Sequence, residues 1–597
     1  MACGLRGLIR LPTAPRVLGA AGGIAALVLA ACVRAAEPEL PTSATTTQQR
    51  ADYEADTPKT ILELQPFRAP KRAPLRLADG TMGVATLTNL NPYINAWYLL
   101  TLEGGRASHR STYHLESPGR HPLRLLSEDP SSVRIAGESG TPCIVWTSPG
   151  GGALEQAAAS GLPYAPLCAG QLYLRNVVAG HQTSLERVTD FLRDHVWGGD
   201  HLIAFVKQVF YEDAFVEKGT PAPTLAPRLS STGALLPVPA STEALEHAVV
   251  PQHLALETPA KELLPGRWYQ VQDLEGVSVS VIAPEHLASS IRFGREASVN
   301  VLDSVESSAL VYLVAFDLGR FDLHFALGTD HPRLDWSDRP PTSSRDPHLP
   351  GPDGVAGAAP LVRTGMVSPT DIDRTIAAFT GGFKREHGAF RYGALAGRNH
   401  GSHYGFIEQG MIFSKLQPGL ATVLVMSDGT VDLKTWMMPD EEQLPRVRFA
   451  RQNGVPLIEF DAAHGASAPG NLVNQWGPGN WSGSANEDLR TLRAGLCLQQ
   501  NGSRRFLIYA YFSSATPSAM ARVFQGYSCQ YAMQSDINAP EHTYLALCVR
   551  HGNVRLIEHL VDGMQEVDRN AGNQLVPRFL AFPDDRDFFY VTRREGS

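Results

Sequence analysis

The sequence predicts an α+β fold: a β-rich C-terminal domain of mixed sheet with short helices, preceded by a smaller N-terminal domain of strands followed by helices. Three observations predict this class. The 54 glycines and 43 prolines among 597 residues indicate many turns and loops. Short apolar runs rich in β-branched and aromatic residues recur between these turns, as strands do. Apolar residues at helical spacing are confined to a few segments.

The size and charge of the chain set broad limits on its organisation. At 597 residues it is too long for one hydrophobic core, so we expect two or three domains. Charged residues make up 19% and hydrophobic residues 43% of the chain, an ordinary globular balance. The net charge of −8 gives no support for a nucleic-acid partner. The composition does not specify an oligomeric state.

Residues 1–32 are typical of a targeting segment. Arginines precede an apolar run, Val17 to Ala31, that is too short and too rich in small residues for a membrane span. The run ends in Leu-Ala-Ala-Cys, which resembles a bacterial lipobox and would make Cys32 the lipidated first residue of the mature chain. A plain secretory signal and a retained anchor are the alternatives. We therefore expect an exported protein, in a periplasmic or cell-surface position of a bacterial envelope, held to the membrane through Cys32.

The remaining chain divides by composition. Residues 33–59 are rich in Thr, Ser, Gln and Ala and predict a disordered tether. Residues 60–216 predict an N-terminal domain of unknown function, in which Thr183 and Glu186 form a capping box at a helix start. Residues 217–266 are rich in Pro and Ala and predict a linker. Residues 267–597 form the predicted C-terminal domain.

The cysteines after Cys32 are odd in number. An exported protein can form disulfides, but five cysteines leave at least one thiol free. Small buried hydrophobic residues are the alternative for each of them. None has the spacing of a zinc site. The five are Cys143, Cys168, Cys497, Cys529 and Cys548.

The C-terminal domain carries the clearest local signals. Asn501-Gly502 and Asp428-Gly429 each lie between apolar runs and predict hairpin turns. Thr516 can cap a helix whose first residue is Pro517. The strand after this helix is expected to end at Asp536 and to place polar residues just beyond its end.

Two groups of polar or flexible residues are candidates for a site. Asp536, Asn538, Glu541 and His542 follow the strand end, where a scaffold can present them to a ligand. Thr380-Gly381-Gly382-Phe383 follows an apolar strand, and its glycines permit close approach of a ligand to the backbone. His403 and His464 lie in polar, Gly-rich segments that suit acid/base groups or sugar contacts. Taken singly, each has an ordinary turn or loop role as its alternative.

The order of these motifs resembles the phosphodiester glycosidase family, over about residues 265–590. The family's Asn-Gly-Gly-Phe-Phe motif is matched by Thr380–Phe383, and the Arg before its apolar-Gly strand by Arg493 or Arg490. Its Ala-x-Asn-Leu-Asp-Gly-Gly-Gly-Ser-Ser-Thr motif is matched by the segment from Ala532 through Asp536 to Thr543. The resemblance implies a hydrolase that acts on glycosidic or sugar-phosphodiester bonds of envelope or extracellular glycans. It implies catalytic roles for Asp536, Glu541 and His542, and substrate-binding roles for Thr380, Gly381, Gly382, Arg493, Asn538, His403 and His464.

The sequence departs from the family where backbone donors would cradle a phosphate or sugar. Ile537-Asn538-Ala539-Pro540 replaces the glycine run, and Pro540 has no N–H to donate. The alternative function is therefore a non-catalytic lipoprotein that binds glycan or an envelope protein through a degenerate site. No cofactor and no metal ligands are predicted, and a requirement for a divalent metal is left open.

Overall fold

The computed structural model describes residues 65–595 except for single residues and several longer stretches, chiefly 188–212, 222–234, 239–247, 333–356, 384–403 and 475–488. The predicted α+β, β-rich class is confirmed, because sheets dominate and the helices are short. All pairings between named strands are antiparallel in the described part, whereas the sequence suggested a mixed sheet. None of its described helices is long and apolar enough to cross a membrane.

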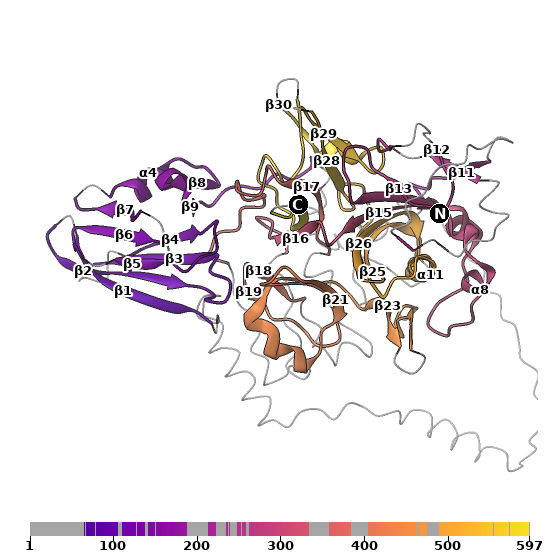
Figure 1. The fold of residues 1–597 in the computed structure, drawn as a ribbon, viewed down its shortest axis with the longest axis horizontal. Coiled ribbons are helices and arrows are strands. Elements are labelled where there is room, and N and C mark those ends of the chain that lie inside the picture. Colours follow the sequence, from indigo (N-terminus) through magenta and orange to yellow (C-terminus); the bar gives the residue numbers. More distant parts are fainter. Residues whose placement is uncertain are drawn as a thin grey trace, which may run out of the picture.

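The N-terminal domain is a strand-rich lobe that projects from the rest of the molecule (Figure 1). One short helix, α4 (Ala153–Ala159), packs beside its strands, and a hydrophobic cluster fills the space between the sheets. Its larger sheet has the order β1 (Ala69–Arg76), β2 (Met82–Asn89), β3 (Trp97–Glu103), β4 (Arg110–Glu116), β9 (Leu172–Arg175), β8 (Tyr164–Leu167). Its smaller sheet has the order β5 (Arg124–Leu126), β6 (Ser132–Ala136), β7 (Cys143–Thr147).

Two antiparallel sheets form the central part of the C-terminal domain. The first has the order β13 (Tyr269–Gln270), β14 (Val277–Ile282), β15 (Val311–Asp317), β26 (Arg504–Ala515), β25 (Thr491–Asn501), β27 (Tyr531–Ile537), β23 (Pro456–Asp461), β24 (Ala466–Pro469). The second has the order β16 (Phe321–Ala326), β32 (Phe588–Arg593), β17 (Thr375–Thr380), β28 (Leu545–His551), β29 (Val554–His559).

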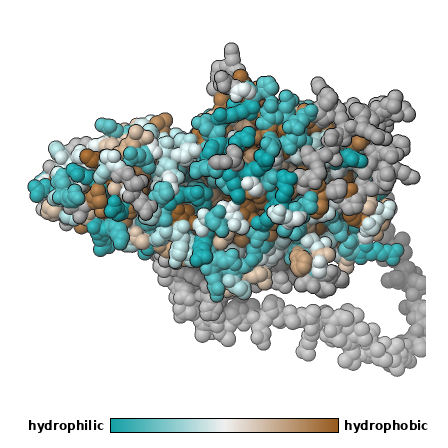
Figure 2. Space-filling model, viewed as in Figure 1, coloured by the Kyte–Doolittle hydropathy of each residue, from teal (hydrophilic) through white to brown (hydrophobic). Residues whose placement is uncertain are grey.

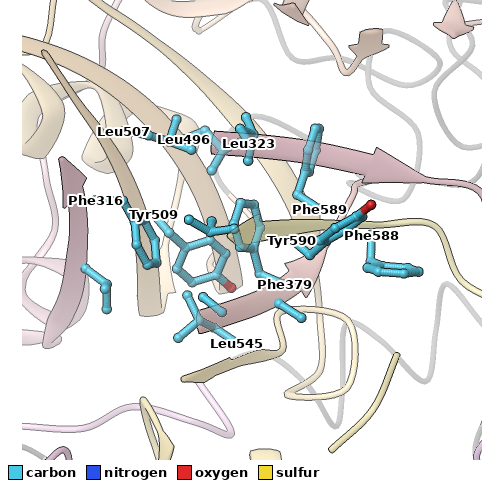
Figure 3. Close-up of a cluster of buried hydrophobic side chains, with 14 of the residues drawn as sticks. Phe316, Leu323, Phe379, Leu496, Leu507, Tyr509, Leu545, Phe588, Phe589 and Tyr590 are labelled. Atoms are coloured by element: carbon cyan, nitrogen blue, oxygen red, sulfur yellow. The ribbon is translucent and has the colours of Figure 1, made fainter. Parts of the chain in front are cut away.

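These two sheets share one hydrophobic core. Figure 3 shows Phe316, Leu496 and Tyr509 of the first sheet together with Phe379 and Phe589 of the second. The rings of Phe379 and Tyr509 lie 5.2 Å apart, centroid to centroid, and those of Phe379 and Phe589 lie 5.5 Å apart. Aromatic side chains bury large apolar areas, so this contact holds the two sheets in a fixed relation. The ends of β17 and β27 are thereby brought to one place.

Smaller elements surround this core. A third sheet has the order β19 (Met411–Ser414), β18 (Phe406–Glu408), β22 (Val447–Gln452), β20 (Ala421–Met426), β21 (Val431–Thr435). Short sheets are formed by β10 (Thr220–Pro221), β11 (Ala248–Pro251) and β12 (Glu262–Leu263), and by β30 (Arg569–Ala571) and β31 (Gln574–Val576). The helices are α8 (Ser289–Arg292), α9 (Ser304–Ser308) and α11 (Pro517–Gly526), with short 3₁₀ turns at Cys168–Gly170, Pro284–His286, Met438–Arg446 and Met564–Val567.

Part of the stretch expected as a linker packs into the C-terminal domain. Leu254, Leu256 and Leu263 are buried in the core that the two sheets share. Leu235 and Val238 are buried in a second cluster beside α11. The described parts of residues 217–266 therefore run over the C-terminal domain and contribute apolar side chains to it.

The local signals of the C-terminal domain are confirmed. The Thr516 hydroxyl accepts a hydrogen bond from the Ala519 N–H at 3.2 Å and caps α11, whose first residue is Pro517. β25 and β26 form the predicted hairpin, but its two-residue loop is Gly502-Ser503, with Asn501 paired in the strand. Gly502 has φ +60°, which favours glycine at this position. The strand expected to end at Asp536 continues to Ile537.

Two disulfides form among the five cysteines. Cys143–Cys168 lies in the N-terminal domain, and Cys497–Cys529 joins β25 to the segment between α11 and β27. Cys548 is a buried free thiol, which confirms that at least one cysteine stays unpaired. Burial raises the pKa of the Cys548 thiol to about 12, so it remains neutral and behaves as a core residue.

The exposed surface is largely polar. In the view of Figure 2, hydrophilic residues cover most of the described surface, and hydrophobic residues are scattered among them. Scattered apolar side chains are normal on soluble surfaces and mark no site by themselves. The site must therefore be sought among the polar residues that the fold brings together.

Candidate functional site

Asp536 lies at the end of β27 and is almost completely buried, with 6% of its surface exposed. One carboxylate oxygen accepts a hydrogen bond from the Arg586 guanidinium at 2.7 Å, and the other accepts from the Ile537 N–H at 2.9 Å. Burial raises the pKa of Asp536 to about 6, although the Arg586 charge opposes this rise. The carboxyl group therefore exchanges its proton near neutral pH.

A residue of the N-terminal region reaches the same place. Glu186 accepts a hydrogen bond from Arg586 Nε at 2.5 Å, across 400 positions of sequence. The capping box fixes this carboxylate: Glu186 accepts the Thr183 N–H at 2.8 Å, and the Thr183 hydroxyl accepts the Glu186 N–H at 3.1 Å. Burial alone would raise the pKa of Glu186, but Arg578 and Arg586 hold it well below its usual range.

Arg578 completes a buried ion network with Arg586, Glu186 and Asp536. The Arg578 guanidinium donates to both carboxylate oxygens of Asp584, at 2.7 and 2.9 Å. Asp585 also lies in this network, 3.8 Å from Arg578 Nη2. Burial and the negative charges of Glu186 and Asp584 raise the pKa of Asp585 well above its usual range. The network thus holds more carboxyl groups than arginines, and this excess of negative charge favours the protonated form of Asp585.

The double-glycine turn, Thr380–Phe383, joins this network from the other sheet. The Gly381 N–H donates to the Asp587 carbonyl oxygen at 2.9 Å. A Cβ atom added to Gly381 would lie only 2.4 Å from an Asp587 carboxylate oxygen, so the contact requires glycine. Gly382 has φ +147°, and a Cβ there would lie 2.9 Å from Asn453 Oδ1. The glycines therefore serve a close approach to protein groups in the described structure.

Asn453 and Arg451 tie the double-glycine turn to β27 and β32. Asn453 accepts the Phe383 N–H at 3.0 Å and donates to the carbonyl oxygens of Gln534 and Ser535 at 2.7 and 2.8 Å. Arg451 Nε donates to an Asp587 carboxylate oxygen at 2.7 Å. Burial would raise the pKa of Asp587, but Arg451 and His331 hold it below its usual range. Asp587 therefore stays ionised while Asp536 titrates.

His542 lies at the partly open edge of the network. Its side chain is 22% exposed, and its Nε2 lies 4.0 Å from a Glu186 carboxylate oxygen. Its Nδ1 lies 3.0 Å from the Ile537 carbonyl oxygen, so Nδ1 carries a proton because a carbonyl can only accept. The Thr380 hydroxyl donates to the His542 carbonyl oxygen at 2.6 Å. The double-glycine turn thus holds the His542 backbone.

Glu541 precedes this histidine and is mostly buried. Burial raises the pKa of its carboxyl group above the usual range. Its Oε1 is buried without a hydrogen-bond partner among the described residues. A carboxyl group in such surroundings favours the neutral acid, which can donate a proton.

Two predicted site residues are held elsewhere. Arg493 is fully buried on β25 and donates to the carbonyl oxygens of Ala515 and Leu489, at 2.7 and 2.9 Å, and to the Gln534 side chain at 3.3 Å. Burial lowers the pKa of Arg493 to about 9. The Asn538 side chain accepts the Thr491 hydroxyl at 3.2 Å. These contacts support the ends of strands. Neither residue pairs with Asp536 in them, and the described ion-pair partner of Asp536 is Arg586.

Three further predictions lie outside the described residues. They concern Cys32 as a lipidation site and His403 and His464 as substrate-binding residues. Thr380, Gly381, Gly382 and His542 are brought to the Asp536 network by the contacts already described, and Glu541 is brought there because its carbonyl oxygen accepts a hydrogen bond from Arg578 at 2.8 Å.

The charged half of the site is not apparent from the sequence patterns described above. Asp584-Asp585-Arg586-Asp587 supplies two acidic partners, one arginine and the anchor of the double-glycine turn. Four consecutive charges between the apolar runs before Pro583 and after Asp587 are a signal that could have found it, since buried charges must be paired. Glu186 was recognised as a capping residue only, because its distant partners leave no local pattern.

The arrangement supports proton transfer in a buried setting. Burial raises the pKa of two carboxyl groups, Asp536 and Glu541. Arg586 joins Asp536 to Glu186, and Glu186 lies 4.0 Å from the partly exposed His542 imidazole. Such shifts are typical of groups that act as general acids or bases, although ion networks also produce them. Among the residues that the structure describes, His, Cys, Asp and Glu side chains form no group of three or more that could hold a metal ion.

Comparisons with known proteins do not identify the chain. No family model and no curated protein matches it. Among solved structures, it is similar to the crystal structure of a hypothetical protein from Synechocystis, at 11% identity over 87% of this chain and 99% of that chain. The TM-score of that superposition is 0.21, a likeness too low to support an argument about fold or function.

Proposed function

We propose that the chain is an exported, membrane-anchored hydrolase that cleaves a glycosidic or sugar-phosphodiester bond of an envelope or extracellular glycan. The observation that carries the proposal is the buried network in which Arg586 joins Asp536 to Glu186, with His542 beside Glu186 and its backbone held by Thr380 of the double-glycine turn. Burial raises the pKa of two carboxyl groups there, Asp536 and Glu541. The resemblance of the motif order to phosphodiester glycosidases supports the substrate class. The export signal and Cys32 support a position at the envelope.

Each group has a role in this proposal. Hydrolysis adds the oxygen of water to the sugar carbon and a proton to the leaving oxygen. Glu541, whose pKa is raised by burial, is suited to donate that proton, and Asp536 or His542 is suited to accept one from the attacking water. Arg493 is left out of the chemistry, because its described hydrogen bonds support the strand ends.

A second function has one specific observation in its favour. Both carboxylate oxygens of Asp536 already accept hydrogen bonds from the protein, and the side chain is only 6% exposed. Pro540 also removes a backbone donor from the segment where the resembled family has glycines. These features suit a lipoprotein that binds glycan or an envelope protein without cleaving it.

Turnover of a sugar 1-phosphodiester and of envelope polysaccharides by the purified protein tests the two functions. Asp536→Asn and Glu541→Gln are expected to lower kcat by about 10²- to 10⁴-fold, the usual contribution of acid/base groups. Glu558→Gln is the matched control: burial also raises the pKa of Glu558, but this residue lies on β29, outside the network, and accepts a hydrogen bond from the Ala255 N–H. Full turnover by Asp536→Asn would reject the hydrolytic site, and glycan binding without turnover in the parent protein would establish the second function.

The anchor is tested separately. Mass spectrometry of the mature protein is expected to find an acylated N-terminal Cys32, and Cys32→Ser is expected to release the protein from membranes. A mature chain that begins at another residue would contradict the lipoprotein assignment without affecting the site.

A further inference from the structure

The N-terminal domain contains a cavity that the proposed function does not use. Its volume is about 300 Å³, at the lower end of small-ligand sites. It lies in the lobe that projects from the C-terminal domain (Figure 1), with walls from β3, β4, β7 and α4. We call it the N-domain pocket; its lining is Leu77, Asp79, Leu102, Ser111, Tyr113, Trp146, Pro149, Gly151 and Glu155.

The walls of the N-domain pocket are fixed by the fold. The disulfide Cys143–Cys168 ties β7, which carries Trp146, to the turn after β8. α4, which carries Glu155, is anchored in the domain core through Leu154 and Ala157. Binding to a preformed cavity costs little conformational entropy, so even a small cavity can bind a ligand.

The carboxylate of Glu155 is folded against the floor of the pocket. A Cβ atom added to Gly151 would lie within 1.9 Å of both Glu155 carboxylate oxygens, so the carboxylate rests directly on the Gly151 backbone. The negative charge of Glu155, after burial, raises the pKa of the Tyr113 hydroxyl, which places the two groups close together. No described residue forms an ion pair with Glu155.

The lining combines negative charge with aromatic surface. Asp79 and Glu155 supply two carboxylates, and no Lys, Arg or His side chain lines the pocket. Tyr113 and Trp146 supply two rings, whose faces attract cations. Trp146 is 6% exposed, and its indole N–H has no hydrogen-bond partner among the described residues. Leu77, Leu102 and Pro149 are suited to an apolar stem.

We propose that the N-domain pocket binds an alkylammonium group, a compact cation on an apolar stem, in contact with Glu155, Tyr113 and Trp146. The stem lies along the apolar wall, and the ammonium donates to the carboxylates beside the rings. A lysine side chain of another polypeptide and a free amine present the same chemistry. The pocket is separate from the Asp536 network, so this binding is independent of the proposed hydrolysis.

Titration of the ¹⁵N-labelled full chain tests the proposal, with the Trp146 indole N–H signal, assigned through Trp146→Phe, as the readout. Three probes are compared: N-acetyl-lysine methylamide, N-acetyl-norleucine methylamide, which lacks only the ammonium, and n-butylammonium. The lysine probe is expected to shift the signal saturably and the norleucine probe to leave it unchanged. Binding of the lysine probe but not of n-butylammonium would indicate a polypeptide source. Raised salt is expected to weaken binding, because the carboxylates are screened.

Two variants at the pocket sharpen the result. Glu155→Gln is expected to weaken the lysine probe at least about fivefold with an unchanged melting temperature, because a double-bonded amide oxygen carries no full charge. Gly151→Ala is also expected to weaken binding of the lysine probe, because the added methyl group displaces the Glu155 carboxylate. Glu103→Gln is the matched control, since this exposed carboxylate pairs with Arg110 outside the pocket. The proposal would be overturned if the norleucine probe bound as tightly as the lysine probe, or if Glu155→Gln bound the lysine probe undiminished. Methyl glucoside is a further probe, and its binding where neither amine binds would also overturn the proposal.

Discussion

The N-terminal region meets the C-terminal domain through two buried charge networks, one around Arg175 and one around Arg586. In the first, Arg175 pairs with Glu116 at 2.5 Å and lies 3.6 Å from Glu408 of the C-terminal domain. In the second, Arg586 pairs with Glu186 of the N-terminal region and with Asp536 of the C-terminal domain. Both arginines are buried, and both networks hold a carboxyl group with a raised pKa.

The two networks differ in how they are closed. The Arg175 guanidinium is covered by the rings of Trp97 and Tyr164, 4.3 and 5.1 Å from the ring centroids. The Arg586 network ends instead at the partly exposed His542. A closed network can only stabilise the contact between domains, whereas an open edge lets a substrate reach a titrating group. Burial and a shifted pKa therefore do not distinguish a site from a structural ion network, but access does.

Arg175→Met is expected to have the largest effect on stability. The change leaves Glu116 and Glu408 buried without their cation, which costs about 3–5 kcal/mol of unfolding free energy. Urea unfolding followed by tryptophan fluorescence measures the loss, because Trp97 lies against the Arg175 guanidinium. Arg110→Met is the control: its ion pair with Glu103 is exposed and is expected to contribute less than about 1 kcal/mol. Equal losses in the two variants would show that the Arg175 network is not a structural anchor.

Glu186→Gln is expected to have a smaller effect on stability, about 2 kcal/mol, because Asp584 and Asp536 remain beside the two arginines. The amide oxygen can still accept the Thr183 N–H, so the helix start is retained. Loss of the Glu186 charge is also expected to lower the pKa of Asp585, which that charge raises. A carboxyl-carbon NMR titration measures the Asp585 pKa. An unchanged pKa would show that the Glu186 charge does not act on Asp585.

The parts of the fold that the sequence predicted are those set by neighbouring residues. Thr516 and Pro517 mark a helix start whatever the rest of the chain does, and Gly502 marks a turn by its own φ preference. Thr183 and Glu186 predicted their own hydrogen bonds for the same reason. The β-rich class likewise follows from many local strand and turn signals.

The candidate site could be predicted only in part, because its bonds join distant positions. Asp536 and the double-glycine turn were found from their places after apolar strands. Their connection through Asn453 and Asp587 spans many residues and leaves no pattern in either segment. The role of Arg493 could not be predicted for another reason: its two shortest described hydrogen bonds go to backbone carbonyls, which every residue carries and no sequence pattern marks.

Glu408→Gln tests the Arg175 network through the pH dependence of the free energy of unfolding. Burial raises the pKa of Glu408 to about 7, above its unfolded value, so the folded state binds this proton more tightly. Stability from this group is therefore fully present below the unfolded pKa of 4.5 and is lost as pH rises from there to about 7, by up to about 1.4 kcal/mol per pH unit. The variant, which cannot ionise, is expected to match the parent near pH 4, below the unfolded pKa of Glu408, and to be the more stable protein near pH 8. Parallel urea midpoints of the two proteins across this range would contradict the shift.

Asp536→Asn is expected to show the smaller pH effect of the two, over a lower window. Burial raises the pKa of Asp536 from 3.8 to about 6, so the parent loses stability relative to the variant as pH rises between these values. The variant is therefore expected to be the more stable protein at neutral pH and to lose turnover. Urea unfolding at pH 4 and pH 7 measures the first effect, and the sugar 1-phosphodiester assay measures the second. Higher stability with lost activity is expected if Asp536 is a buried catalytic carboxyl, because its ionised form is costly to bury. Lower stability of the variant at both pH values would place Asp536 with the structural ion pairs of the Arg175 network.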